Sequence, residues 1–268
     1  MAVFDALLDG LGTRDARVRD VRIGLRVTAV RSHRLGLAYT FPRDPLAHGD
    51  EPQADAPPLR GRPARELAEL ARSGEVMHAA VGIAAINSLI DPPGGIEDRH
   101  ALDVILEYGR GGVVTLVGHF PFTERLRAQV RRLHVLELLP REGDLPATDA
   151  PRVIPGSDVV AITASTLVNR TLDGLLELAR GKTVILIGPS TPLTPALLAC
   201  GVTALCGSVV TDPEAALRGV SEGVGFRRMA GLRRVVLMVP RSSPSCRWSA
   251  RPTRRTSALR SPAGSLRN

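Results

Sequence analysis

Short apolar runs separated by longer amphipathic stretches fill the chain from about residue 96 to residue 240. Each run is rich in Val, Ile and Leu, which is typical of strands buried on both faces of a sheet. Strands that alternate with helical stretches in this way predict an α/β fold with a mostly parallel sheet. We expect its strands at Val113–Val117, His134–Leu138, Val159–Thr163, Thr183–Ile187, Val202–Cys206 and Val235–Val239.

Helix start and stop signals lie between these runs. Thr194-Pro195 places an N-cap residue before a proline at the first helical position, and Gly201 follows the expected helix end. Asp212-Pro213 repeats the start signal, and Gly181 closes a helix that begins near Thr171. The alternation of strands and helices is therefore supported by local capping chemistry as well as by hydrophobicity.

The chain before residue 96 has a different pattern. Val21–Val30 alternates loosely between apolar and polar positions, and the apolar run Leu35–Phe41 follows after four polar residues, so we expect two strands in a hairpin. Ala64–Arg72 and Glu75–Ile90 have apolar residues at helical spacing. A hairpin followed by two helices predicts a small α+β domain.

Two segments rich in Pro and Gly divide the chain. Pro42–Pro63 has no apolar period and predicts a surface loop. Asp91–Gly95 has the sequence Asp-Pro-Pro-Gly-Gly, which ends the preceding helix and marks a domain boundary. We therefore expect an α+β domain at residues 1–95 and an α/β domain at residues 96–240.

Length and composition indicate a soluble protein. A chain of 268 residues can bury a sizeable core, and no stretch approaches the roughly 18 apolar residues that a membrane-spanning helix needs. The N-terminus lacks the basic and apolar regions of a secretory signal, so we expect a cytoplasmic protein. Cys200, Cys206 and Cys246 have no CxxC spacing, which argues against a disulfide framework or a structural zinc site.

The positive charge is concentrated at the C-terminus. Of the net charge of +8, the last 28 residues contribute seven arginines and no acid, which leaves +1 for residues 1–240. The segment is rich in Ser and Pro, with Trp248 its one aromatic residue, so it lacks the apolar area needed to offset its ordering entropy. We expect residues 241–268 to form a disordered basic tail, and this distribution disfavours nucleic acid as a partner.

Candidate catalytic residues follow the first two predicted strands, because ligands of parallel sheets bind beyond the carboxyl ends of the strands. Gly118 permits close approach of the backbone, and His119 titrates near neutral pH. Glu137 lies nineteen residues after Gly118, close to the spacing at which Rossmann folds place an acid on ribose hydroxyls. His119 and Glu137 are the candidate acid and base, although a loop that covers the sheet edge and a solvated carboxylate are structural alternatives.

Hydroxyl-rich turns follow the third and fourth predicted strands. Hydroxyls and unpaired N–H groups at the start of a helix bind anions, and Pro189 and Pro192 fix the backbone of the second turn. The structural alternative is that Asn169 or Thr171 only caps a helix. No GxGxxG motif is present after the first strand, which argues against a dinucleotide as the ligand. The candidate ligand-binding residues at these strand ends are Gly118, Thr163, Thr166, Asn169, Gly188, Ser190 and Thr191.

The same turns carry a resemblance to a known family. Five segments resemble the putative heavy-metal chelation family, a domain of unknown function. They are Gly118–Phe122, Thr163–Thr171, Gly188–Leu193, Gly82–Asn87 and Gly36–Thr40. The resemblance covers roughly residues 10–240. It implies an enolase N-terminal-like α+β domain packed on a Rossmann-like domain, with a pocket to which both contribute. This chain departs from the family pattern at Ala164-Ser165, where Gly-Thr is more frequent, and in its arginine-rich end.

The resemblance also bears on Asn87, which lies on the apolar face of its predicted helix. A buried amide needs hydrogen-bond partners, and these are either the neighbouring backbone or a ligand. The family pattern favours the second alternative. We therefore expect an interdomain pocket that includes Asn87, His119, Thr166, Asn169 and Ser190.

The family resemblance implies binding or processing of a small anionic chelator, such as a pterin, flavin or siderophore-like molecule or its metal chelate, in metal homeostasis. If the protein is an enzyme, we expect His119 or Glu137 to act as acid or base in a condensation or hydrolysis. The alternatives are a methyltransferase-like transferase and a non-catalytic binding protein. The sequence has no metal-ligand spacing among its candidate ligands His119, His134, Cys200 and Cys206. The sequence identifies no cofactor and leaves homo-oligomerisation open.

Overall fold

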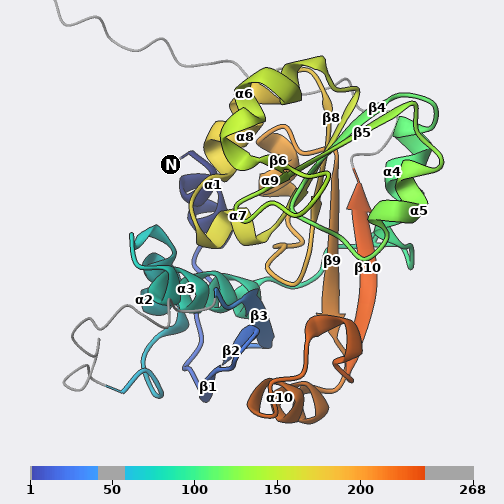
Figure 1. The fold of residues 1–268 in the computed structure, drawn as a ribbon. Coiled ribbons are helices and arrows are strands. Elements are labelled where there is room, and N and C mark those ends of the chain that lie inside the picture. The colour runs from blue at the N-terminus through green and yellow to red at the C-terminus, as the bar shows by residue number, and fades with distance from the viewer. Residues whose placement is uncertain (1, 42–57, 239–268) are drawn as a thin grey trace, which may run out of the picture.

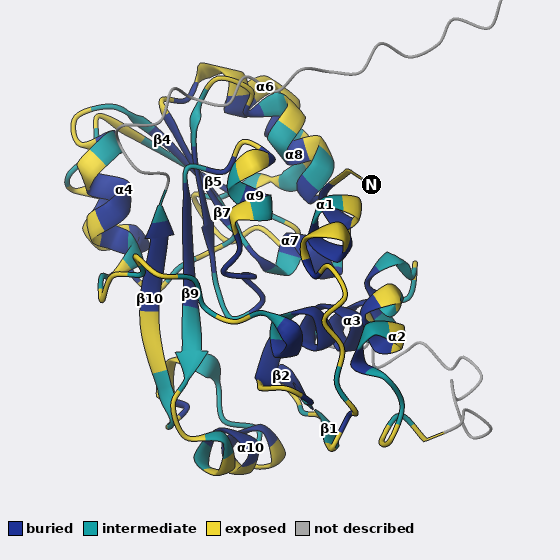
Figure 2. Cartoon of the chain, turned by 180° about the vertical axis from the view of Figure 1, so that it is seen from behind, coloured by how far each residue is buried: buried dark blue, intermediate teal, exposed yellow. Residues whose placement is uncertain are grey.

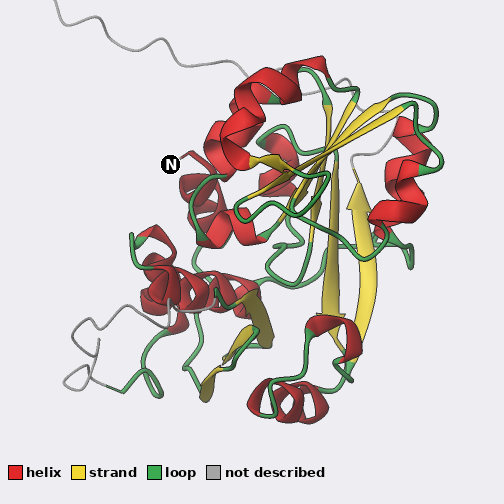
Figure 3. Ribbon diagram, viewed as in Figure 1, coloured by secondary structure: helices red, strands yellow, loops and turns green. Residues whose placement is uncertain are grey.

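The structure, a computed structural model, describes residues 2–41 and 58–238 (Figure 1). These residues form a three-stranded antiparallel sheet and a seven-stranded, mostly parallel sheet, with helices around both (Figure 3). The tail expected at 241–268, and residues 42–57 of the predicted loop, lie outside the described residues.

The large sheet confirms the predicted Rossmann-like α/β fold. Its strand order is β10-β9-β8-β7-β4-β5-β6, so the chain starts at the interior strand β4, moves to one edge, returns beside β4 at the central strand β7 and then moves to the other edge. All neighbours are parallel except β10, which pairs antiparallel with β9. The strands are β4 (Val113–Val117), β5 (Arg132–Glu137), β6 (Leu145–Pro146), β7 (Val159–Thr163), β8 (Thr183–Ile187), β9 (Ala204–Val210) and β10 (Leu232–Met238).

Helices cover both faces of this sheet, and most of its central strand positions are buried (Figure 2). In β7, Val159 and Ala161 belong to one apolar cluster while Val160 and Ile162 belong to another, as the two-residue period of a strand requires. The first face packs against α4 (Ala101–Gly109) and α5 (Thr123–Arg127). The second face packs against α1 (Ala2–Gly10), α6 (Ala150–Val153), α7 (Ser165–Val168), α8 (Leu172–Leu178) and α9 (Pro195–Ala199).

The N-terminal helix α1 was not predicted. Val3, Phe4, Leu7 and Leu8 form its buried face, and the N–H of Val3 donates to Asp173 Oδ1 on α8 at 3.1 Å. The chain therefore begins against the large sheet's helices before it enters the small sheet.

The small sheet has three strands where the pattern predicted two. They are β1 (Asp20–Ile23), β2 (Val27–Arg31) and β3 (Leu35–Tyr39), paired in that order. The predicted strand Val21–Val30 is wrong because the chain turns at Gly24, whose N–H donates to Val27 O at 3.0 Å. A Cβ at Gly24 would lie 2.4 Å from Val220 O, so the turn depends on a residue without a side chain.

Both faces of the small sheet are also covered. Helix α3 (Val76–Leu89), which follows α2 (Ala64–Ala68) and a short 3₁₀ segment at Glu69–Arg72, packs on one face. Helix α10 (Pro213–Ser221), which lies in the connection from β9 to β10, packs on the other, where Leu217 and Val220 meet Val27 and Leu37. Strands β9 and β10 are longer than expected because they extend as a two-stranded ribbon to α10 (Figure 3).

Two predicted helix starts are confirmed. Thr194 accepts a hydrogen bond from Ala196 N ahead of α9, and Asp212 accepts one from Ala215 N ahead of α10. No helix within the described ranges has both the length and the apolar character needed to cross a membrane.

Candidate functional site

A cavity of about 310 Å³ lies between the small sheet and the large sheet. Four segments form its wall: the β2–β3 turn with β3, the end of α3, the loop after β8, and the end of β9 with the start of α10. The lining residues are His33, Arg34, Leu35, Gly36, Leu37, Asn87, Ile90, Pro92, Pro189, Thr191, Leu193, Ser208, Val209, Val210 and Pro213.

The lining combines an apolar body with a few polar groups. Leu35, Leu37, Ile90, Leu193 and Val209 are among the apolar residues, and amide and hydroxyl groups also face the cavity. The lining contains two basic residues, His33 and Arg34, and no carboxylate. Its chemistry therefore suits a molecule with an apolar ring and a negative group.

Asn87 holds the two parts of the chain together at this cavity. Its Nδ2 donates to Leu37 O at 2.8 Å and to Ser190 O at 3.4 Å. The amide is thus satisfied by backbone from β3 and from the loop after β8, and it also lines the cavity. Backbone hydrogen bonds and a place in the cavity wall, the two alternatives that the sequence left open for Asn87, are therefore compatible.

The loop after β8 is fixed on both sides. Ser190 is fully buried and its Oγ accepts from the N–H of Tyr39 at 2.7 Å. Thr191 lines the cavity while its hydroxyl donates to Cys206 O at 3.3 Å, and the N–H of Gly188 donates to the same oxygen at 3.0 Å. Of the predicted ligand residues, Asn87 and Thr191 therefore reach the cavity, with Ser190 directly behind them.

The turn after β7 is not part of this lining. Thr166 donates to Thr163 O at 2.6 Å, and the Thr163 and Ser165 hydroxyls lie 3.0 Å apart. Asn169 Oδ1 accepts from the N–H and the hydroxyl of Thr171, at 3.3 and 2.7 Å. These side chains satisfy one another and brace the start of α8.

His119 lies at a different place, where the strand order reverses between β4 and β7. Gly118 precedes it with a positive φ of 102°, and a Cβ there would lie 2.9 Å from Thr163 Cγ2. Glu137 accepts from His119 N at 2.7 Å and from Leu138 N at 3.1 Å, so its carboxylate fixes the backbone of this loop. His119 is also absent from the lining of the cavity.

The partner of the His119 ring is Asp144, which sequence reasoning missed. Asp144 Oδ2 lies 3.4 Å from His119 Nδ1, and the Asp144 side chain is only 2 % exposed. The same oxygen accepts from Arg141 N at 3.2 Å. Asp144 stands in no motif, and the one local signal is that it immediately precedes the short strand β6, which pairs with β5.

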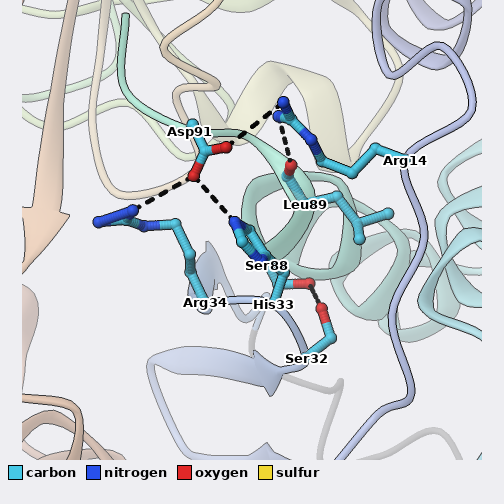
Figure 4. A network of polar contacts seen from close by, with 7 residues as sticks. All are labelled: Arg14, Ser32, His33, Arg34, Ser88, Leu89 and Asp91. Atoms are coloured by element: carbon cyan, nitrogen blue, oxygen red, sulfur yellow. Dashed lines mark hydrogen bonds and ion pairs between the residues drawn. The ribbon is translucent and has the colours of Figure 1, made fainter.

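A cluster of charged and basic side chains around Asp91, which the sequence did not predict, lies beside the cavity (Figure 4). Asp91 Oδ1 accepts from His33 Nε2 at 2.9 Å and from Arg34 Nη1 at 3.3 Å, and its Oδ2 lies 3.3 Å from Arg14 Nη2. The hydrogen bond from His33, with the nearby charges of His33, Arg14 and Arg34, lowers the pKa of Asp91. One carboxylate thus opposes three basic side chains.

The described residues hold no group of three or more His, Cys, Asp or Glu side chains placed to bind a metal. Cys200 and Cys206 are buried free thiols, and burial raises the pKa of Cys206 to about 12.

Comparisons with known proteins identify the family. Residues 100–239 match the family described as "Putative heavy-metal chelation", and residues 4–90 match a second family with the same description. The chain belongs to the heavy-metal chelation family. A crystal structure of a family member of unknown function from Desulfitobacterium hafniense is 29 % identical, with a TM-score of 0.77 over 88 % of this chain and 98 % of that chain.

Two further proteins are similar to this chain. A family member of unknown function from Pyrococcus horikoshii is 22 % identical, with a TM-score of 0.73 over 89 % of this chain and 98 % of that chain, which shows the fold. An uncharacterized protein of Methanocaldococcus jannaschii is 27 % identical over an alignment of 192 positions, and the match covers 68 % of this chain and 73 % of that protein.

Proposed function

We propose that this heavy-metal chelation protein binds a small anionic, chelator-like molecule in the cavity between its two sheets. The observation that carries the proposal is the basic character of the lining, which contains Arg34 and His33 and no carboxylate. A negative group placed there accepts charge-assisted hydrogen bonds from Arg34, and Asp91, the carboxylate that pairs with both basic residues, is not part of the lining.

The size of the cavity limits the ligand. Its 310 Å³ is at the lower end of the roughly 300–1,000 Å³ that small-molecule pockets occupy. A pterin-sized ring system with an acidic substituent suits this volume better than a flavin nucleotide or a large siderophore.

On this proposal the ligand, and not the protein, binds the metal. The described part of the chain has no cluster of metal-binding side chains, so the donor atoms for a metal would belong to the bound molecule. On this proposal the protein carries a chelator or its metal complex, and the cavity recognises the organic part.

A second candidate function, catalysis, rests on His119 and Asp144. A buried carboxylate 3.4 Å from Nδ1 favours an imidazole whose Nε2 is free to accept a proton, at the sheet position where Rossmann-like enzymes bind ligands. Glu137 then serves as a positioning residue, because both its oxygens bind backbone N–H groups. A condensation, hydrolysis or group transfer would use Gly118 and the Thr163–Asn169 turn as further contacts.

The test of the binding proposal is a thermal-shift screen of the full chain against pterins, aromatic carboxylates and their neutral amides, each with and without a divalent metal. Acids that bind should raise the melting temperature and their amides should not, since binding to the folded state alone stabilises it. Isothermal titration calorimetry then gives the affinities.

A cavity-filling variant provides the control. Val209→Trp places a large ring in the cavity and should abolish the shift, whereas Leu138→Trp adds the same ring at a position that is 61 % exposed and outside the lining. If no anion raises the melting temperature, or if Val209→Trp binds as well as the wild type, the proposal fails.

A further inference from the structure

We infer that Asp91 is an internal counter-anion, and that a carboxylate on the ligand replaces it on Arg34 and His33. This inference rests on the proposed binding function and assigns the residues that recognise the anion. It also assigns the ligand class: a flat aromatic ring that bears a carboxylate.

Arg34 and His33 take part in two sites at once, the cavity and the contact with Asp91. Both line the cavity, and both also donate to the same Oδ1 atom of Asp91. Their donor groups are therefore directed to a carboxylate oxygen at the edge of the cavity already (Figure 4). A carboxylate that entered the cavity would offer them the same kind of acceptor.

The turn that holds Arg34 and His33 is fixed by hydrogen bonds to α3. The hydroxyls of Ser32 and Ser88 lie 2.6 Å apart in a buried contact, and the N–H of Arg34 donates to Ser88 O at 2.9 Å. The β2–β3 turn is thus tied to the end of α3. The ligand needs to change side-chain directions only, and the backbone that presents them stays in place.

Asp91 keeps a basic partner after the exchange. Its other oxygen, Oδ2, pairs with Arg14 at 3.3 Å, and Arg14 is held independently by a 3.0 Å hydrogen bond to Leu89 O. When Arg34 and His33 turn to the ligand, Asp91 keeps this partner, and its side chain already lies at the surface, where it is 44 % exposed. No carboxylate is left buried and unpaired, so the exchange has a small cost.

The ligand class follows from the rest of the wall. Leu35, Leu37, Ile90 and Leu193 provide apolar surface next to the two basic residues. A flat aromatic ring buries its faces against such side chains, and a carboxylate on its edge reaches Arg34. A ring nitrogen beside the carboxylate would make the molecule a bidentate chelator, consistent with the family description.

The experiment uses quinoline-2-carboxylate as the probe, quinoline-2-carboxamide as its neutral counterpart and inorganic phosphate as a different anion. Calorimetry on the full chain compares the wild type with Arg34→Gln and Asp91→Asn. Arg34→Gln should weaken carboxylate binding by roughly three- to tenfold, a modest factor because the side chain is 42 % exposed. Asp91→Asn should strengthen it by a few fold, because a competing anion is removed.

The matched control is Arg31→Gln. Arg31 lies on β2, pairs with Glu214 at 2.6 Å and is not part of the cavity lining, so its removal changes the net charge equally but leaves the site intact. It should leave the affinity unchanged. Arg34→Lys, which keeps the charge but loses the planar fork, should fall between wild type and Arg34→Gln.

The outcomes separate the two proposals. A gain of affinity in Asp91→Asn cannot come from misfolding, so it supports the inference directly. Carboxylate binding that is equal in wild type, Arg34→Gln and Asp91→Asn, or that is weakened by Asp91→Asn, overturns the inference and leaves the proposed function standing. Phosphate bound more tightly than the carboxylate overturns the assigned ligand class. If the wild type binds no anion at all, the proposed function fails and the inference falls with it.

Discussion

The backbone N–H of Tyr39 donates a 2.7 Å hydrogen bond to the hydroxyl of Ser190, 151 positions later in the chain. This bond joins the edge strand β3 of the small sheet to the loop after β8 of the large one. Asn87 adds a second tie at the same place, through Leu37 O and Ser190 O. The wall of the cavity is therefore built on contacts between the two sheets.

Replacing Ser190, which is fully buried, by Ala should lower the free energy of unfolding by about 1–3 kcal/mol, because the partly buried N–H of Tyr39 loses its acceptor. Urea denaturation followed by circular dichroism measures the change. Ser221→Ala removes an exposed hydroxyl that bonds to Arg22 and should change stability by less than about 0.5 kcal/mol. Equal effects of the two substitutions would contradict the prediction.

Gly36→Ala should destabilise the protein by at least about 3 kcal/mol, or prevent soluble expression. A Cβ at Gly36 would lie 2.1 Å from Ala84 O and 2.3 Å from Ser88 N, and these are backbone atoms of α3 that have no room to move. Gly174→Ala is the matched control, because that helical glycine on α8 has no atom within 4 Å of its added Cβ. It should raise stability by up to about 1 kcal/mol. Thermal melts of both variants and of the wild type measure these changes in stability.

The neutral ring of His119 should carry its proton on Nδ1, because Asp144 Oδ2 is the nearby acceptor at 3.4 Å. Long-range ¹H–¹⁵N correlation spectra at pH 8 identify the tautomer. Asp144→Ala should shift the ring toward the Nε2–H tautomer that free imidazole favours. Glu137→Gln should not, since Glu137 binds backbone N–H groups of this loop. An Nε2–H tautomer in the wild type would remove the basis for a catalytic role.

Cys206 should resist alkylation in the native protein. Burial raises the pKa of its thiol to about 12, so at pH 8 only about one molecule in ten thousand carries the reactive thiolate. Peptide mapping by mass spectrometry after iodoacetamide treatment should find Cys206 modified in denaturant and unmodified without it. Rapid native labelling would show that this part of β9 opens easily.

The sequence by itself determined six of the seven strands of the large sheet, all except the two-residue strand β6. The predicted bounds of β4, β7 and β8 are those observed, because strands buried on both faces leave continuous apolar runs that need no further information. The caps at Thr194 and Asp212 were likewise readable, since an N-cap hydrogen bond is made within a few residues.

Only the tertiary structure decided which polar residues meet. Asp91 reaches His33 across 58 positions, and Asp144 reaches His119 because β6 pairs with β5 and β5 pairs with β4. The third strand of the small sheet likewise depends on Gly24, where α10 approaches from the far end of the chain. Such contacts are set by strand order and helix packing between distant segments, and no local pattern of residues encodes them.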